Sequence, residues 1–432
     1  MSAHVSTSLP RIVVVGAGFA GLNFCQRFPS GRARITVIDR QNHHLFQPLL
    51  YQVAAAGLSA VDIAQPIRAI LNNKSALEVV MAEVTAIDLV ARRVGHTAGE
   101  IDYDYLVLGF GGVTSYFGHD DWAQFAPGLK TLDDALRIRR KILLAFERAE
   151  TEADEVRRKE LMTIVVIGGG PTGVELAGTF AELARTVLRK DFDRIDPTKA
   201  RVLLIEGGPR VLGTFPEELS ASARQQLDHL GVEVRTGVPV AAIREGEVVV
   251  GSETIRAATT IWAAGVRAHP LGRTLGVELD RAGRVKVLPD LSVPGFPEVF
   301  VAGDMAALTD RNGVAVPGVC PAAMQMGVHT AKVIADELVV GKREPARRRD
   351  YAYVDKGAMA TIGRSKAVAM LAGVKFSGFP AWLAWLGVHL VFLIGFRNRL
   401  SVLMQWTYSY LTYKRGARVI TGATGEPPAH SA

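Results

Sequence analysis

Cysteine is scarce in this sequence, and its scarcity excludes several kinds of protein. Only Cys25 and Cys320 occur among 432 residues, so the fold cannot depend on a disulfide framework, and the composition is typical of a reducing compartment. No cluster of Cys, Asp or Glu joins the adjacent residues His43 and His44, and we expect no metal site. The first ten residues lack the apolar core and cleavage pattern of a secretory signal, so we expect none.

Excess positive charge is also missing from most of the chain. The net charge is +7, but residues 346–432 carry 12 Lys and Arg against 3 Asp and Glu, which leaves about −2 for the rest. A basic surface spread over the body is therefore absent, and we expect no nucleic-acid partner. The length and the 48% hydrophobic content are sufficient for two or three domains with substantial cores.

A glycine-rich stretch near the start predicts a dinucleotide site. Residues 12–15 are β-branched, which indicates a short strand buried on both faces. After this strand, Gly16 permits a tight turn, Gly18 lets a pyrophosphate approach the backbone, and Gly21 lets the next helix pack closely. A second apolar strand ends in Asp39, at the spacing where a carboxylate accepts a hydrogen bond from a ribose 2′-hydroxyl. Phosphates would then bind the free N–H groups at the helix N-terminus.

The same pattern returns in the middle of the chain. Residues 161–167 read as a strand, Gly168, Gly170 and Gly173 follow it, and the next strand ends in Glu206. Two such folds require two dinucleotides, as in an enzyme that passes hydride from a nicotinamide to a flavin. Glu206 would favour the free 2′-hydroxyl of NADH over the 2′-phosphate of NADPH, unless it is simply a solvated acid at a strand end.

Several other features lie near these turns. Glu175 begins the second fingerprint helix, where it contacts the nicotinamide region or only stabilises the helix dipole. Residues 41–53 form an apolar loop that covers a cofactor ring or packs on its own domain. Asp304, after a strand that ends near Gly303, binds a flavin ribityl chain beside a following helix, or merely caps that helix. Further elements expected are strands at 79–87 and 259–262 and a helix at 131–158.

These residues resemble the two-dinucleotide-binding-domain flavoprotein reductases, and within them the type II NADH dehydrogenases, which are non-proton-pumping NADH:quinone oxidoreductases. The resemblance extends from Ile12 to about Ile420 and is carried by His43–Val53, Gly168–Glu175, Trp262–Val266, Ala302–Asp304 and Phe396–Leu400. It implies FAD contacts at Gly16, Ala17, Gly18, Gly21, Asp39, Gly303 and Asp304. It implies NADH contacts at Gly168, Gly170, Gly173, Glu175, Glu206 and Gly265.

The resemblance also implies a quinone pocket beside the flavin. Family members line it with a segment of the form Ala-Gln-x-Ala-x-Gln, and here Pro321 stands at the first glutamine position, so Gln325 alone remains. Lys356 matches a family lysine near flavin and quinone, where a cation stabilises developing negative charge. A surface lysine is the alternative. The type of quinone is not readable from this pattern.

The tail has the composition of a membrane-binding segment. Residues 379–396 contain no Asp, Glu, Lys or Arg, and residues 400–415 mix apolar and aromatic side chains with a basic end. Tryptophan and tyrosine favour the headgroup level, and basic residues favour anionic lipid, so the pattern favours an anchor lying in the membrane interface. A single membrane span and a core or dimer-interface segment are the alternatives.

The sequence therefore predicts an α/β protein with two Rossmann-like dinucleotide-binding domains, for FAD and NADH, and a C-terminal membrane-associating helical segment. The expected parts are 1–115 and 289–345 for FAD, 116–160 as a helical connection, 161–288 for NADH, and 346–432 for the membrane and quinone. The expected activity is FAD-dependent transfer of electrons from NADH to a membrane quinone without proton pumping. A sulfide:quinone oxidoreductase and a slow NADH- and FAD-binding regulatory protein are the alternatives. The expected location is peripheral, on the cytoplasmic face of the inner or cell membrane, and a homodimer is a further candidate assembly.

Overall fold

The chain is organised as two compact units, each assembled from separate segments. The computed structural model describes residues 9–310, 313–412 and 416–420. The first unit comprises Met1–His44, Gln65–Val113 and Val266–Lys356, and the second comprises Leu45–Ala64, Thr114–Gly265 and Gly357–Ala432. Each unit contains one of the two glycine-rich turns. The domain boundaries expected from the sequence stay a prediction.

A six-stranded sheet forms the centre of the first unit. Its order is β20-β21-β9-β1-β2-β5, and every neighbouring pair is parallel except the edge pair β20–β21. The strands are β1 (Arg11–Val15), β2 (Arg34–Asp39), β5 (Leu77–Met81), β9 (Tyr105–Leu108), β20 (Ser292–Val293) and β21 (Phe296–Val301). The central strand β1 is buried after its first residue, because apolar side chains of β1 point to both faces of the sheet.

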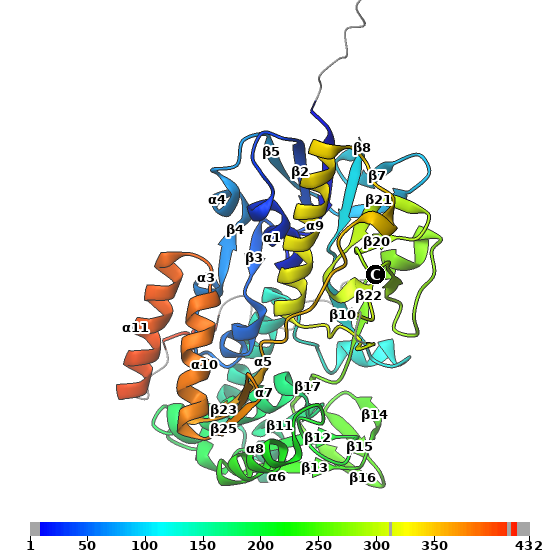
Figure 1. The fold of residues 1–432 in the computed structure, drawn as a ribbon. Helices are drawn as coiled ribbons and strands as arrows, with labels where there is room; N and C mark the ends of the chain where they lie inside the picture. The colour runs from blue at the N-terminus through cyan, green and yellow to red at the C-terminus, as the bar shows by residue number, and fades with distance from the viewer. Residues whose placement is uncertain (1–8, 311–312, 413–415, 421–432) are drawn as a thin grey trace, which may run out of the picture. The chain divides into compact units, whose positions relative to one another are not determined.

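Two helices of the first unit pack against each other with very close backbones. They are α1 (Phe19–Arg27) and α9 (Cys320–Val340), which lie side by side in Figure 1. A Cβ atom on Gly327 of α9 would lie 2.1 Å from the carbonyl oxygen of Ala20 in α1. Glycine at this position therefore sets the distance between the two helices.

The strand expected over 79–87 is wrong, because the structure contains two strands there. They are β5 and β6 (Val84–Asp88), and only β5 belongs to the large sheet. β6 forms an antiparallel sheet with β7 (Arg93–His96) and β8 (Gly99–Asp102). Apolar residues occur on both sides of Ala82 and Glu83, so the sequence period does not reveal that the chain passes there from one sheet to another.

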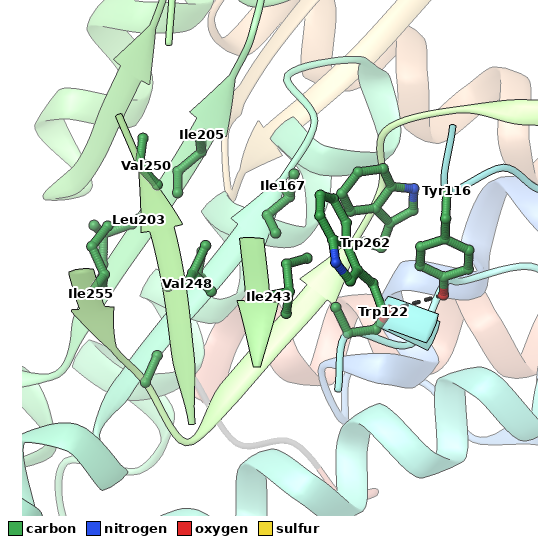
Figure 2. Packing of buried hydrophobic residues seen from close by; sticks show 13 residues of the cluster. Tyr116, Trp122, Ile167, Leu203, Ile205, Ile243, Val248, Val250, Ile255 and Trp262 are labelled. Atoms are coloured by element: carbon green, nitrogen blue, oxygen red, sulfur yellow. Dashed lines mark hydrogen bonds between the residues drawn. The ribbon is translucent and has the colours of Figure 1, made fainter. Parts of the chain in front are cut away.

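A four-stranded parallel sheet forms the centre of the second unit. Its order is β13-β12-β11-β17, with β11 (Thr163–Ile167), β12 (Arg201–Glu206), β13 (Val232–Thr236) and β17 (Thr259–Trp262). Figure 2 shows alternate residues of β11 and β12, including Ile167, Leu203 and Ile205, packed against the small sheet β14 (Val240–Arg244), β15 (Glu247–Val250) and β16 (Glu253–Arg256). Trp122 and Trp262 close this core edge to face, with ring centroids 5.6 Å apart.

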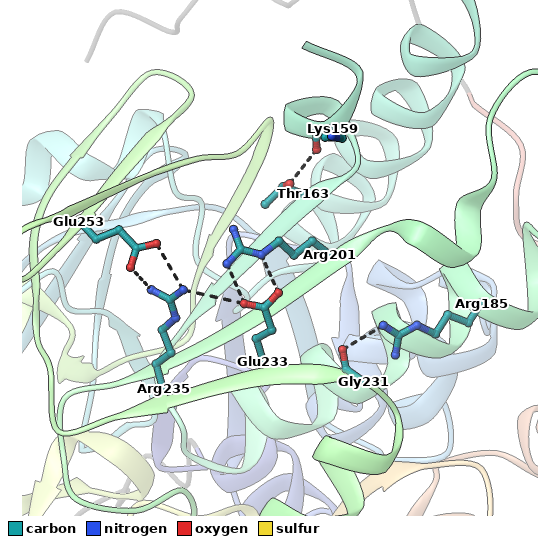
Figure 3. Close-up of polar contacts among 8 residues, drawn as sticks. All are labelled: Lys159, Thr163, Arg185, Arg201, Gly231, Glu233, Arg235 and Glu253. Atoms are coloured by element: carbon teal, nitrogen blue, oxygen red, sulfur yellow. Dashed lines mark hydrogen bonds and ion pairs between the residues drawn. The ribbon is translucent and has the colours of Figure 1, made fainter. Parts of the chain in front are cut away.

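Ion pairs join the strands of the second unit on their exposed side. The guanidinium of Arg201 in β12 donates to both carboxylate oxygens of Glu233 in β13, at 2.6 and 2.7 Å (Figure 3). This hydrogen bond holds the pKa of the Glu233 carboxyl below its ordinary value. Arg235 pairs with Glu253 at 2.6 Å in the same way. Because these side chains are partly exposed to solvent, the pairs contribute little to stability.

The helix expected over 131–158 is wrong as one continuous helix. The structure has α5 (Leu132–Thr151) followed by α6 (Glu155–Leu161). Thr131 begins α5 with a capping box, and Asp154 begins α6 by accepting a hydrogen bond from the Val156 backbone at 2.8 Å. A second cap inside an amphipathic pattern divides the helix, although the apolar period continues across the break.

The C-terminal part of the second unit begins with an antiparallel sheet of β23 (Ala358–Gly363), β24 (Lys366–Leu371) and β25 (Val374–Ser377). This sheet packs on helix α7 (Pro171–Glu182), and a Cβ atom on Gly178 would lie 1.6 Å from the carbonyl oxygen of Ile362. Two further helices follow, α10 (Phe379–Phe392) and α11 (Phe396–Thr412). No helix in the described part of the chain is long and apolar enough to cross a bilayer.

Candidate active site

The first glycine-rich turn has the geometry that the sequence predicts. Gly16 has φ = +90°, and a Cβ atom there would lie 2.4 Å from the carbonyl oxygen of Gly109. A Cβ atom on Gly21 would lie 1.9 Å from the carbonyl oxygen of Gly16, so α1 can follow the turn only without a side chain. A Cβ atom on Gly18 would meet nothing within 4 Å. The turn is thus closed at Gly16 and Gly21 and open at Gly18, where a phosphate would approach.

Asp39 holds this turn from the end of β2. Its carboxylate accepts hydrogen bonds from the backbone N–H of Ala17 at 2.7 Å and of Gln41 at 2.8 Å. Burial raises the pKa of the Asp39 carboxyl, and the two N–H donors oppose that rise. A carboxylate fixed in this way has lone pairs left for a ribose hydroxyl, so its geometry fits the predicted role.

The expectation of a helix directly after Asp304 is wrong. Gly303, with φ = +77°, and Asp304 lie in a single 3₁₀ turn that is followed by the short strand β22 (Ala306–Ala307), and the next α-helix is α9. The Asp304 carboxylate instead faces Gly112, where an added Cβ atom would lie 3.2 Å from one of its oxygens. Asp304 therefore lies beside the backbone of Gly112 and has no helix directly after it, so its predicted flavin contact stays a prediction.

The second glycine-rich turn repeats the first one in the second unit. Gly168 has φ = +108°, and a Cβ atom on Gly173 would lie 1.7 Å from its carbonyl oxygen. Gly170 precedes α7, has no side-chain cap, and faces open space. Glu206 accepts hydrogen bonds from the backbone N–H of Gly169 at 2.5 Å and of Gly208 at 2.6 Å. The two turns share one design: closed at the first and third glycine, open at the second, and fixed by an acid.

Gly265 follows the last strand of this sheet, and its backbone requires glycine. It has φ = +135°, and an added Cβ atom would lie 2.6 Å from the ring of Phe117. Its carbonyl oxygen accepts a hydrogen bond from the Ser115 backbone at 3.2 Å. The position is therefore constrained by its own unit, and its predicted contact with NADH stays a prediction.

Glu175 carries a carboxyl group with a raised pKa. It lies on α7, and burial raises its pKa well above the ordinary value, against a hydrogen bond from the Thr361 backbone of β23. Both roles considered from the sequence, a contact with the nicotinamide region and stabilisation of the helix dipole, stay predictions.

Gln325 is already engaged in the first unit. Its side-chain amide donates to the carbonyl oxygen of Val354 and accepts from the N–H of the same residue, both at 3.0 Å. Pro321, at the position where the family has another glutamine, lies in the first turn of α9, where proline is favoured. Lys356 is exposed. Gln325 retains one amide hydrogen and one lone pair for a ligand, so its predicted quinone contact stays a prediction.

A cavity in the second unit was not foreseen from the sequence. Its volume is about 130 Å³, and it lies among α2 (Leu50–Ala54), the end of α7, α10 and α11. Its wall combines polar side chains with five aromatic ones, namely Tyr51, Trp382, Trp385, Trp406 and Tyr410. The indole N–H of Trp385 is buried without a hydrogen-bond partner among the described residues. A buried donor without a partner is unusual in a folded protein.

Polar groups fix the walls of this cavity. Gln52 accepts a hydrogen bond from the indole N–H of Trp406 at 2.8 Å, and the guanidinium of Arg364 stacks over Tyr410 at 3.9 Å. Glu182 accepts a hydrogen bond from the Arg364 backbone. By residue type, the tryptophans of the tail are expected at the headgroup level of a membrane. The sequence of α10 is apolar almost throughout, so it has no distinct apolar side that would predict which residues face the protein.

The two cysteines have environments that matter for the choice of chemistry. Cys25 lies buried in α1, and burial raises the pKa of its thiol to about 12. Cys320 begins α9. A thiol with such a raised pKa is not a thiolate at neutral pH, so Cys25 is unsuited to redox catalysis. No cluster of three metal-binding side chains occurs among residues 9–310, 313–412 and 416–420.

Comparison with known families defines the class of protein. Residues 10–327 match the family model described as pyridine nucleotide-disulphide oxidoreductase, and residues 356–414 match the model described as NDH2 C-terminal domain. The first match covers both glycine-rich turns and both acids described above. The class is therefore that of the pyridine nucleotide-disulphide oxidoreductases.

Similar proteins narrow the class. The type II NADH:quinone oxidoreductase Ndh of Mycobacterium tuberculosis is 46% identical over 425 residues, 95% of this chain and 90% of that protein. The type II NADH:quinone oxidoreductase of Staphylococcus aureus strain NCTC 8325 / PS 47 is 30% identical over 86% of this chain and 92% of that protein. The chain belongs to the type II NADH:quinone oxidoreductase family, which confirms the family expected from the sequence.

Solved structures confirm the expected fold class. The structure of NDH2 from Plasmodium falciparum in complex with NADH has a TM-score of 0.87 at 20% identity and covers 94% of this chain and 99% of that chain. The sulfide:quinone oxidoreductase from Aquifex aeolicus has a TM-score of 0.71 at 18% identity and covers 90% and 92%. At these identities both show a shared fold and nothing of the substrate.

Proposed function

We propose that this chain oxidises NADH and reduces a membrane quinone, with FAD as its resident cofactor and without proton pumping. The observation that carries the proposal is the repeated turn, open at Gly18 in one unit and at Gly170 in the other, each with a carboxylate fixed beside it. FAD, when bound, accepts hydride from NADH and returns two electrons to a quinone. The protein supplies binding, orientation and proton-carrying groups for these two reactions.

The first turn would hold FAD, and the second would hold NADH. At the first turn, free N–H groups would bind the pyrophosphate, and Asp39 and Asp304 would accept from hydroxyl groups. At the second turn, Glu206 would accept from the adenine ribose. Glu175, whose carboxyl pKa is raised by burial, would form a hydrogen bond with the nicotinamide carboxamide.

Two places have the chemistry to bind a quinone. Gln325 and Lys356 offer an amide hydrogen and a cation, as the family resemblance implies. The cavity of the second unit offers aromatic side chains together with polar ones such as Glu182 and Arg364. Two substitutions distinguish these places as quinone sites, because Leu386→Trp fills the cavity, whereas Gln325→Ala removes the amide. Leu383→Trp, at an exposed position of the same helix, is the control.

The two helices α10 and α11 support docking on a membrane surface. The polar side of α11 faces the protein, since Ser401 and Gln405 each donate to the buried carboxylate of Asp62 at 2.8 Å. Large apolar side chains of both helices are exposed instead, namely Phe379, Leu383, Val391, Phe396, Leu400, Leu403, Met404 and Leu411. An apolar outer face on a polar-anchored helix is suited to the lipid interface, and we place it on the cytoplasmic side, where NADH is available.

The test of the proposed function is anaerobic reduction of the purified protein with NADH. We expect the flavin absorbance to bleach, and then to return when a quinone is added. If the protein were a sulfide:quinone oxidoreductase, sulfide would bleach the flavin and NADH would not. The buried thiol of Cys25 disfavours this alternative. A regulatory binder would reduce quinone once and stop, whereas an enzyme sustains turnover. A homodimer remains part of the proposal, and the mass of the detergent-solubilised protein by light scattering tests it.

A further inference from the structure

A buried histidine next to the first glycine-rich turn has one ring nitrogen without a partner. His44 lies in the short strand β3 (His43–Leu45) and is 2% exposed. Its Nδ1 atom lies 2.9 Å from the carbonyl oxygen of Ala17. Its Nε2 atom is buried and has no hydrogen-bond partner among the described residues. Buried polar atoms without partners are rare, and each one requires an explanation.

The partner of Nδ1 fixes the proton on the ring. A carbonyl oxygen can only accept, so Nδ1 must carry the hydrogen and donate it to Ala17. Burial lowers the pKa of His44, so the ring is neutral and carries no second hydrogen. Nε2 is therefore a bare acceptor on the side of the ring away from Ala17. Its missing partner must be a donor such as a hydroxyl group.

The surroundings indicate where that donor comes from. Ala17 is the residue between Gly16 and Gly18, and its N–H is held by Asp39. The ring of Phe19, in the first turn of α1, contacts His44 edge to face at 5.1 Å. The same short stretch thus combines open space at Gly18, an uncapped helix N-terminus and a buried acceptor. Phosphate oxygens need the first two, and sugar hydroxyls need the third.

We propose that Nε2 of His44 accepts a hydrogen bond from a hydroxyl group of the ribityl or ribose part of bound FAD. The inference rests on the FAD site proposed above. His44 would act in positioning the cofactor, with Ala17 holding the ring in the required tautomer. No proton is transferred, and no charge changes, in this contact.

The neighbouring histidine provides a matched control. His43 points to the other face of β3, is more exposed, and has its Nδ1 atom 3.1 Å from the amide oxygen of Asn42. His43→Asn should weaken FAD retention less than His44→Asn does. His44→Asn keeps a donor near Ala17 but removes the distal acceptor, whereas His44→Gln places an amide oxygen near the position of Nε2.

The experiment follows FAD leaving the diluted holoenzyme, by the rise in flavin fluorescence, for the wild type and the three variants. We expect His44→Asn to weaken FAD binding about tenfold, the size of one lost hydrogen bond, and His44→Gln to weaken it less. The thermal unfolding midpoint of His44→Asn should recover to that of the wild type with excess FAD, because a binding defect is offset by mass action.

Two results would overturn the inference. Retention of FAD by His44→Asn equal to that of His43→Asn would mean that a buried water satisfies Nε2. Lower unfolding midpoints for both His44 variants that excess FAD does not restore would assign the ring a packing role. The readout is FAD retention and not NADH turnover. A wild type that holds FAD but is not bleached by NADH would therefore contradict the proposed function and leave this inference standing.

Discussion

At the scale of single residues, the two acids at the ends of β2 and β12 hold the two glycine-rich turns in the same way. Asp39 and Glu206 each accept two backbone N–H groups from residues near their own glycine-rich turn. Each acid thus shapes its turn before any ligand binds, and a ribose would meet a carboxylate that is already oriented. Such preorganisation reduces the cost of binding.

Removing the charge of Glu206 should weaken the choice between NADH and NADPH. We expect Glu206→Gln to lower kcat/KM for NADH about tenfold or more, because one oxygen that accepts a backbone N–H is replaced by an NH₂ group. NADPH should lose less, since the repulsion of its 2′-phosphate disappears. Steady-state kinetics with both nucleotides measures the ratio. Glu253→Gln, on the exposed strand β16, should leave the ratio unchanged.

Glu175 should make the folded protein less stable as the pH rises. Its pKa is raised above the ordinary value of 4.5, so above that value the folded state binds more protons than the unfolded state. Stability then falls with increasing pH, by up to about 1.4 kcal/mol per pH unit, until the folded carboxyl ionises. Unfolding midpoints of the wild type and Glu175→Gln should diverge between pH 5 and pH 8, with the variant higher at pH 8. Parallel curves would contradict the raised pKa.

The residues that spacing predicts are those whose partners lie within one strand–turn–helix unit. The glycines and acids of both turns fall in this group, because short loops fix where they meet. The amide of Gln325, the free N–H of Trp385 and the orphan nitrogen of His44 do not. Their environments are made by segments distant in sequence, and no local period encodes them.

At the scale of elements, the contact between α7 and β23 connects the second glycine-rich turn to the C-terminal sheet. Gly178 allows the helix to lie directly on the strand, and Thr361, next to Ile362, supplies the backbone donor for Glu175. β23 therefore supplies a hydrogen bond that lowers the pKa of Glu175 on α7, against the effect of burial.

Gly178→Ala should destabilise this contact. The added methyl group would lie 1.6 Å from the Ile362 carbonyl oxygen, which is backbone and cannot move aside alone. We expect a loss of roughly 1–3 kcal/mol or more in unfolding free energy, the usual cost of overpacking. Gly387→Ala in α10 is the control, since a Cβ atom there meets nothing within 4 Å. Its expected effect is neutral or slightly stabilising. Denaturant unfolding of both variants measures the difference.

Element boundaries were the least predictable part of the fold. The sequence pattern over 131–158 is amphipathic throughout, and only the cap at Asp154 reveals two helices. The strand expected over 79–87 fails because both halves are apolar yet belong to different sheets. The missing helix after Asp304 shows that a capping residue type does not by itself begin a helix. Period and residue type identify elements, whereas tertiary contacts decide their ends.

At the scale of the whole molecule, the apolar side chains on α10 and α11 should control membrane binding. Phe396 is 82% exposed and Leu411 is 73% exposed. Replacing each with Asp should weaken sedimentation with anionic liposomes by at least about tenfold, because each buried apolar side chain contributes about 1.5–3 kcal/mol. Val90→Asp, at a position that is 86% exposed in the first unit, is the control. Equal binding by all three variants would contradict the docking surface.

The orientation of α11 has a practical consequence. Because Ser401 and Gln405 bind Asp62 through hydrogen bonds, the side of the helix that faces solvent is the apolar one. Without lipid, this apolar side can be covered only by detergent or by another protein molecule. Purified protein should therefore stay monodisperse above the critical micelle concentration of a mild detergent and aggregate below it, although its fold is unchanged.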